Sequence, residues 1–181
     1  MMNFEELDPN TREWMLNEFN SEQHQTPHFE PTELNPIGLA AFPDIMRQAI
    51  RDGNIASLAT SLSNSSYWKA TRTYLRKGKT ITQKIDPITS AQRLAHSEFT
   101  TWYTRGMARK LKEEGIVQCQ VYRADSAAQP NCECTSLEGN MVSVDEIYNG
   151  HRSKYFPIPN QDAFSIPSSP FCHHTIRRVT V

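Results

Sequence analysis

The chain has 181 residues, of which 38% are hydrophobic, with a formal net charge of −1 at pH 7 and a mean hydropathy of −0.60. This near-neutral charge is not typical of a protein that binds nucleic acid over its whole surface, and the low hydropathy predicts a modest core. No apolar run approaches the ~20 residues that span a bilayer. The start MMNFEELDP is acidic, unlike a signal peptide. We therefore expect a protein that is made and kept in the cytoplasm.

Charge is uneven along the chain. Residues 1–35 are acidic, whereas residues 69–84 are basic. Aromatic residues interleave with the cations of the basic stretch, a pattern that favours contact with a phosphate backbone. Two other interpretations remain: the acidic and basic parts meet between copies of the chain, or both are solvated faces. The six cations are Lys69, Arg72, Arg76, Lys77, Lys79 and Lys84.

The first third of the chain has a helical pattern interrupted by prolines. Asp-Pro is a good helix start, because Asp caps the first turn and Pro loses no hydrogen bond there. A stretch with three prolines and little periodicity predicts an extended arm. The expected elements are a helix from Asp8-Pro9 to about Asn20, an arm over 21–37, a helix from about Pro43 to Asp52 and a helix over Ile55–Leu62.

The pattern changes between Tyr67 and Ile85. Aromatic and β-branched residues surround Lys77-Gly78-Lys79, which favours a β-hairpin that turns at the glycine. A helix that continues through Tyr74 and Leu75 is the competing interpretation.

The clearest helix runs from Asp86 to Gly115. Asp86 and Pro87 form a good helix start, and Gly115 is well placed to end the helix in the left-handed conformation. We expect one apolar face, made of Ile88, Ala91, Ala95, Phe99, Trp102, Tyr103, Gly106, Met107 and Leu111. The polar face carries Arg93, Ser97, Thr101, Arg105 and Lys112.

Shorter elements follow the long helix. Ile116 to Ala124 alternates as a half-buried strand, with Val117, Cys119 and Val121 on its buried face. The later elements are a capping box at Ser143–Glu146 that opens a helix ending near Gly150, a proline-rich surface segment at 155–171 and a strand over 172–181.

Together these patterns predict an α+β fold. It is mainly helical, with one long central helix, a small antiparallel sheet or hairpin, and extended arms. We expect residues 1–37 to form an N-terminal helix and arm, and residues 38–181 to form the helical core with the hairpin, the long helix and a C-terminal β and loop region.

Cysteine and histidine pairs near the C-terminus have the spacing of a metal site. Cys132-x-Cys134 and Cys172-x-His174 supply three thiolates and one imidazole, which would complete a tetrahedral zinc site. Cys-x-Cys is not the usual Cys-x-x-Cys knuckle, and His173 competes with His174. The alternative is a set of ordinary reduced cysteines without a cofactor. Cys119 lies in the strand pattern and is expected in the core.

No catalytic motif accompanies these residues. The sequence contains no G-x-S-x-G, P-loop, G-x-G-x-x-G or H-E-x-x-H. The carboxylate pairs Glu113-Glu114 and Asp145-Glu146 lie at helix ends, where capping and solvation explain them. We therefore expect a protein that is not an enzyme.

Three segments between residues 86 and 179 carry a resemblance: SEFTTWYTRGMARKLKEEG, SLEGNMVSVDE and PSSPFCHHTI. This part of the chain resembles the minor head morphogenesis domain named after phage Mu. There a comparable helix leads to paired cysteines, a Leu-x-Gly segment and a proline-rich stretch with Cys and His. The first cysteine pair is one residue closer here, and a histidine stands where a cysteine is common. The matching positions are Cys132, Cys134, Leu137, Gly139, Cys172 and His174.

A second set of short motifs covers nearly the whole chain. It resembles a group of phage and prophage structural proteins of similar length. The motifs are Leu7-Asp8 with Thr11-Arg12, Phe42-Pro43, Glu98-Phe99 with Tyr103 and Arg105-Gly106, and Val121 to Ala124.

Both resemblances imply a structural protein of a tailed-bacteriophage virion, assembled in the host cytoplasm. The expected function is that of a head–tail connector, or adaptor, in the neck. It would form a ring, dock on the portal protein, contact other neck proteins and touch packaged DNA through the six cations. A minor head morphogenesis protein is one alternative. Another is a zinc-stabilised nucleic-acid-binding module, with the Cys–His set as scaffold and residues 69–84 as the DNA surface.

Overall fold

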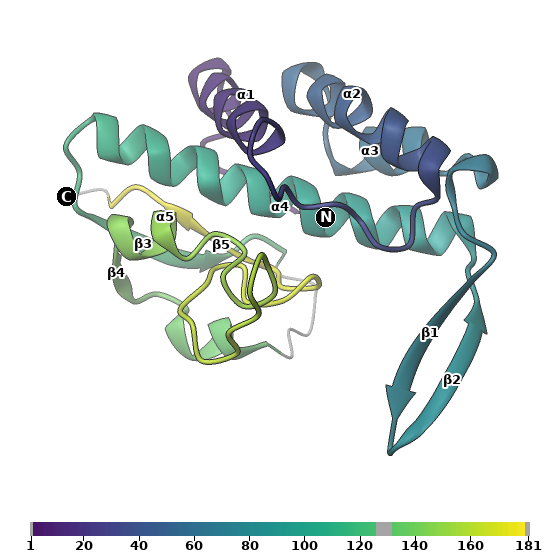
Figure 1. The fold of residues 1–181 in the computed structure, drawn as a ribbon. Helices are drawn as coiled ribbons and strands as arrows, with labels where there is room; N and C mark the ends of the chain where they lie inside the picture. Colours follow the sequence, from purple (N-terminus) through teal and green to yellow (C-terminus); the bar gives the residue numbers. More distant parts are fainter. Residues whose placement is uncertain (1, 126–131, 180–181) are drawn as a thin grey trace. The chain divides into compact units, whose positions relative to one another are not determined.

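Side-chain caps set the helix starts in this computed structural model, which describes residues 2–125 and 132–179. The Asp8 carboxylate accepts a hydrogen bond from the backbone N–H of Thr11 at 2.7 Å, and Asn54 with Ser57 forms a capping box. Asp86 accepts a hydrogen bond from the N–H of Thr89 at 2.9 Å. The helices are α1 (Pro9–Gln23), α2 (Pro36–Asp52), α3 (Ile55–Leu62), α4 (Pro87–Glu113) and α5 (Val144–Asn149) (Figure 1).

The expected arm over 21–37 is shorter than predicted, because α1 extends to Gln23 and α2 begins at Pro36. Pro43, expected to start the second helix, lies inside α2. An internal proline removes one helical hydrogen bond and disfavours the helix. The helix nevertheless continues, because it buries residues on both sides of the proline: Gly38, Phe42, Met46, Ala49 and Ile50.

The long helix α4 is confirmed, but its faces differ from the expected pattern. Phe99, Trp102 and Tyr103 are buried as predicted, whereas Ile88 is 60% exposed. Ser97 and Thr101, expected on the polar face, are buried. The prediction of a single apolar stripe underestimated how many residues of α4 are buried, because the C-terminal half of the helix is covered on more than one side.

Two neighbours cover this half of α4. On one side a Cβ at Gly106 would lie 2.7 Å from the backbone nitrogen of Met15, so the glycine allows close approach of α1. On the other side Thr104 Oγ1 lies 2.7 Å from Thr175 Oγ1 of strand β5 (His174–Arg177). Because both α1 and the sheet pack against the helix, its buried surface includes threonines and serines as well as apolar residues.

Two small antiparallel sheets complete the α+β fold. The predicted hairpin is confirmed, with β1 (Thr71–Arg76) paired to β2 (Lys79–Lys84). A second sheet has the order β4-β3-β5, with β3 (Gln118–Arg123) in the centre between β4 (Met141–Ser143) and β5 (His174–Arg177). The predicted strand over 116–124 is confirmed, but Val117 is 76% exposed because it precedes the first paired residue of β3.

The C-terminal part differs in detail from the prediction. Ser143 caps α5 as expected, and its hydroxyl accepts a hydrogen bond from the N–H of Glu146. The proline-rich segment 155–171 is not wholly at the surface, since Ser165 and Ile166 are buried. The final strand covers only His174–Arg177, and residues 180–181 lie outside the described part of the chain.

The chain divides into two units. The first unit comprises Met1–Phe29 and His96–Val181, and the second comprises Glu30–Ala95. The boundary expected after residue 37 lies within the second unit. Among the helices of the described residues, none is both long and apolar enough to cross a bilayer.

Candidate functional site

Strand β3 positions both halves of the predicted metal site. On one edge it pairs with β4, and the backbone N–H of Gly139 donates to the carbonyl of Val121 at 2.8 Å. This anchors the short 3-10 helix Glu133–Leu137, which carries Cys134 and begins after Cys132. On the other edge β3 pairs with β5, which places His174 opposite Arg123. The two halves therefore meet although 40 residues separate Cys132 from Cys172.

The four predicted ligands form one cluster. One ligand atom from each of Cys132, Cys134, Cys172 and His174 lies within 4.8 Å of all the others. Cys132 Sγ is 3.5 Å from Cys172 Sγ and 3.3 Å from His174 Nδ1, and Cys172 Sγ is 3.7 Å from the same nitrogen. Cys134, Cys172 and His174 are buried, and Cys132 is half-buried.

These distances fit a tetrahedral zinc ion. Zinc–sulfur bonds of about 2.3 Å and zinc–nitrogen bonds of about 2.0–2.1 Å give ligand-to-ligand edges of about 3.5–3.8 Å. The three separations given above lie close to that range. A set of three thiols and one imidazole is also the soft, nitrogen-containing donor set that suits zinc.

Glu138 orients the histidine of the cluster. His174 Nε2 lies 3.3 Å from Glu138 Oε2, so with Nε2 as the donor, Nδ1 is left as an acceptor toward the three sulfurs. Arg123 holds the same carboxylate oxygen at 2.8 Å. Burial opposes ionisation of Glu138, but the hydrogen bonds from Arg123 and His174 lower its pKa. A carboxylate that accepts the second N–H of a ligand histidine is a common feature of zinc sites.

Proximity of the sulfurs separates the acidities of two cysteines. The hydrogen bond with Cys172 lowers the pKa of the Cys134 thiol to about 7, against the effect of burial. The same hydrogen bond, together with burial, raises the pKa of Cys172. Two thiolates this close repel each other, so the pair loses its first proton more easily than its second.

Neighbouring candidates lie outside the cluster. His173 directly precedes β5 and is not in the cluster; its ring packs on that of His96 in α4, with ring centroids 4.7 Å apart. This resolves the competition between the two histidines in favour of His174. Cys119 is buried in β3 as predicted, and its Sγ lies 3.7 Å from the carbonyl of Val142.

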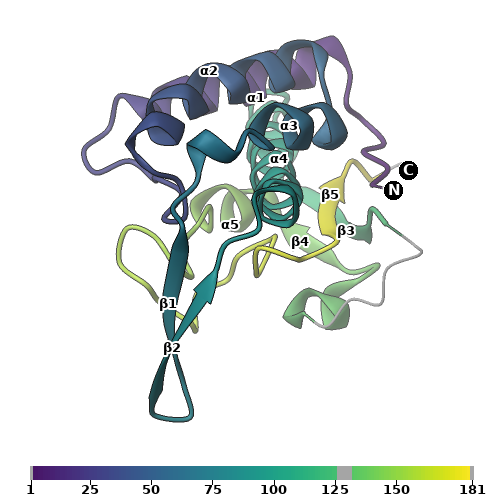
Figure 2. The ribbon, with the colours of Figure 1, turned by 90° about the vertical axis from the view of Figure 1, so that its right-hand side faces the viewer.

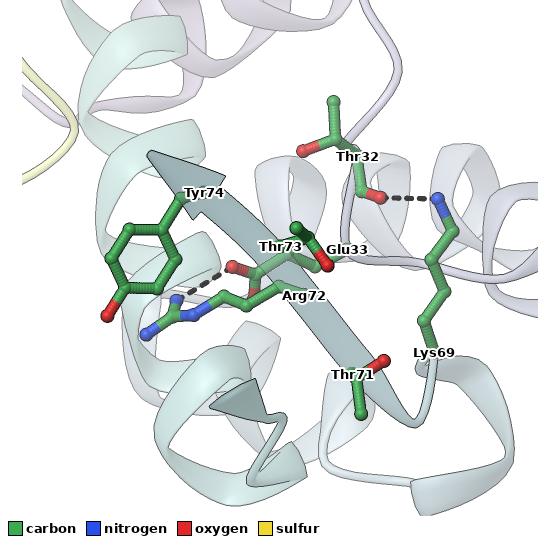
Figure 3. A pocket seen from close by; sticks show the side chains of 7 residues that line it. All are labelled: Thr32, Glu33, Lys69, Thr71, Arg72, Thr73 and Tyr74. Carbon is green, nitrogen blue, oxygen red and sulfur yellow. Dashed lines mark hydrogen bonds and ion pairs between the residues drawn. The ribbon is translucent and has the colours of Figure 1, made fainter. Parts of the chain in front are cut away.

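The six predicted cations do not form one equivalent set. At the base of the hairpin Lys69 donates to the Thr32 carbonyl at 2.7 Å, and Arg72 pairs with Glu33 at 2.8 Å. Figure 3 shows these two contacts in a groove of about 590 Å³. The groove is lined by Thr32, Glu33, Lys69, Thr71, Arg72, Thr73 and Tyr74. The other four cations are exposed and do not line this groove: Arg76, Lys77, Lys79 and Lys84.

Sequence reasoning missed a second buried polar cluster in the first unit. Arg152 is 3% exposed and donates to both carboxylate oxygens of Glu98, at 2.7 and 2.9 Å, and to Glu22 at 3.2 Å. Its guanidinium also lies 4.1 Å from the ring centroid of Phe29. His151 Nε2 is 2.9 Å from Glu22. The charged residues of this cluster lie far apart in the sequence and form no short motif, so the sequence alone did not predict it.

Comparison with known proteins adds no further assignment. No protein-family model, curated protein or solved structure matches this chain.

Proposed function

We propose that this chain is a structural protein of a tailed-phage particle, of the minor head morphogenesis kind, and that Cys132, Cys134, Cys172 and His174 bind one zinc ion. The observation that carries the proposal is the convergence of these four ligands, with Glu138 supporting the histidine. The zinc role is structural. Four protein ligands fill a tetrahedral ion, so no coordination position remains for a substrate.

The zinc ion would connect two segments that have little regular structure of their own. Cys134 belongs to a short 3-10 helix that Cys132 immediately precedes, and Cys172 lies in a turn before β5. Few backbone hydrogen bonds join such segments, so a metal bond between them replaces the core that a small β region lacks. Metal binding therefore contributes directly to the folding of residues 132–179.

The identity of the residues in the cluster supports the virion role. The positions that carry the resemblance to the Mu-like head domain include all four ligands. They also include Gly139, whose φ of 84° is strained for other residues and which joins the 3-10 helix to β3. The cluster and its connection to β3 therefore account for five of the six matching positions.

A head–tail connector is the second candidate. It is favoured by the motifs that extend over nearly the whole chain, including the N-terminal helix and the β3 segment. Both candidates predict contact with the portal protein. Only the connector predicts a ring of copies that joins head to tail, with other neck proteins as neighbours.

Native mass spectrometry tests the zinc and assembly states together. We expect one zinc ion per chain after purification without added metal, and a lower melting temperature after chelation. A chain with no bound metal after zinc addition would contradict the zinc site.

Coexpression with the portal protein of the phage that encodes the chain tests the virion role. Co-sedimentation of zinc-bearing copies with the portal supports the head-protein proposal, and a ring of copies supports the connector. A chain that associates with neither the portal nor any other particle protein would contradict both.

A further inference from the structure

The tip of the β1–β2 hairpin carries three cations in four residues, Arg76, Lys77 and Lys79 around Gly78. Between residues 69 and 85 the sequence has no acidic residue. Figures 1 and 2 show the hairpin as a two-stranded ribbon. Most of its side chains are exposed on both faces. A single two-stranded hairpin of this kind is only marginally stable in water. The stability of the hairpin therefore does not explain why it carries so many exposed charges.

Two features of the tip oppose hairpin stability. Arg76 lies directly opposite Lys79 in the register, and like charges in that position repel each other. Lys77 has a φ of 49° and Gly78 a φ of 74°, so both central residues of the turn are left-handed. Asn or Asp precedes Gly in most such turns, because its short side chain tolerates the left-handed conformation and can hydrogen-bond the neighbouring backbone. Lys77 lacks this advantage. The tip therefore maintains positive charge at a cost in folding free energy.

The tip cations differ from those at the base. Lys69 and Arg72 have partners within their own unit, as described above. For Arg76, Lys77 and Lys79, no side-chain hydrogen bond or ion pair is found in the described ranges 2–125 and 132–179. An anionic partner from outside the chain would relieve the repulsion between Arg76 and Lys79.

The two faces of the ribbon are chemically distinct. The strand register places Arg72 opposite Gln83, Tyr74 opposite Ile81, and Arg76 opposite Lys79 on one face. The other face carries hydroxyl groups and one cation, from Thr71, Thr73, Thr80, Thr82 and Lys84, beside the exposed Leu75. Cations and hydroxyls are both donors to phosphate oxygens. Donors on both faces fit a ligand that has phosphates on either side.

We propose that the β1–β2 ribbon binds the phosphate backbones of a nucleic-acid duplex. A groove of duplex DNA is wide enough for a two-stranded ribbon and has a phosphate strand along each wall. Strands of six residues extend about 20 Å, enough to follow the groove past several phosphates. Single-stranded ligands need stacking platforms, and Tyr74 is the one aromatic residue within the two strands. This inference goes beyond the proposed virion and zinc roles and does not depend on them.

Fluorescence anisotropy with a labelled 20-base-pair DNA duplex of mixed sequence tests the proposal on the 181-residue chain as purified. The tip variant is R76Q/K79Q, and the matched control is R47Q/R51Q, which removes two cations from α2 of the same unit. We expect the tip variant to weaken binding about tenfold or more and to lower the salt slope by about two, since each lost phosphate contact lowers it by about 0.9. The control should keep the wild-type affinity and slope.

Three results would overturn the proposal. The first is a wild-type chain that does not bind the duplex at 50 mM salt. The second is an equal loss in the tip variant and the control. The third is a tip variant that keeps DNA affinity but no longer binds an acidic peptide of residues 1–35, which would assign the ribbon to a protein contact. Circular dichroism and zinc content, measured on the same samples, separate these results from misfolding and from failure of the zinc site.

Discussion

The Cys–His cluster, which we propose to bind zinc, and the β1–β2 ribbon use charge in opposite ways. In the cluster, polar groups from distant segments are buried, and His174, Glu138 and Arg123 form a continuous chain of contacts. In the ribbon, the contacts are local to one hairpin and the tip cations face solvent. Buried polar groups are costly unless they are partnered, whereas exposed ones cost little. The burial of the cluster therefore suits the proposed role in folding, and the exposure of the ribbon suits the proposed role in binding.

The largest expected effect is the loss of a zinc ligand. Under the proposed zinc role, replacement of Cys172 by Ser should abolish zinc binding and destabilise the two segments that carry the ligands, because the metal would join them. We expect the bound zinc to fall from one per chain to none, and the melting temperature to fall with it. Metal analysis and thermal unfolding measure both quantities.

Cys119→Ser is the matched control for this variant. Its thiol is buried in β3 but does not belong to the cluster. Burial of a hydroxyl there costs some stability, but the variant should retain one zinc ion. Equal zinc content in the Cys172 and Cys119 variants would show that the cluster is not the zinc site.

The Arg152 cluster provides the second largest effect. Arg152→Met leaves Glu98 and Glu22 buried without their cation, which should lower the free energy of unfolding by about 3–5 kcal/mol. Urea unfolding of the zinc-loaded chain measures this loss. Zinc content should stay at one per chain, which separates this defect from that of the metal site. A variant as stable as the wild type would show that the two carboxylates gain other partners.

We expect His151 to have a smaller, pH-dependent effect on the stability of the same unit. Burial, together with the neighbouring Arg152 and Arg105, lowers its pKa to about 4, against the opposing effect of the hydrogen bond that His151 donates to Glu22. The unfolded chain therefore binds a proton below about pH 6.5 that the folded chain does not. The contribution of His151 to the free energy of unfolding is therefore fully present above pH 6.5 and is lost as the pH falls toward 4.

The measurement compares His151→Gln with the wild type. Between pH 7.5 and pH 5 the wild type should lose about 2 kcal/mol more than the variant. Glu22, whose pKa is lowered by its partners against burial, contributes only at lower pH. Because both proteins keep the zinc cluster, the difference between them isolates His151. Parallel pH profiles would refute the assignment.

The sequence predicted local features of both regions better than long-range ones. Asp86-Pro87 marked the start of α4, Lys77-Gly78 marked the hairpin turn, and paired spacing marked the four ligands. Glu138 was not identified as a partner of His174, because strand pairing, not spacing, brings them together. Tertiary packing, not any local pattern, likewise brings Arg152 to Glu98, which lies 54 residues earlier in α4.

The errors have a related physical cause. Pro43 was assigned to a helix start from local propensity, but burial of Phe42 and Met46 keeps α2 continuous through it. Thr101 was assigned to a solvated face, but α4 is packed on more than one side in this half. In both cases tertiary packing outweighed a local preference of a few kcal/mol or less.

The smallest effect has the opposite sign and belongs to the ribbon. Lys79→Glu places a carboxylate opposite Arg76 and replaces a repulsive cross-strand pair by an attractive one. The hairpin should gain about 0.2–1 kcal/mol, seen as slower hydrogen exchange of the strand amides by up to about fivefold. Affinity for duplex DNA should fall at the same time, because a cation becomes an anion at the tip. Lys79→Gln, which only removes the repulsion, should give an intermediate result in both measurements. A hairpin that is both more stable and equally active in DNA binding would show that the opposed cations at the tip have no binding role.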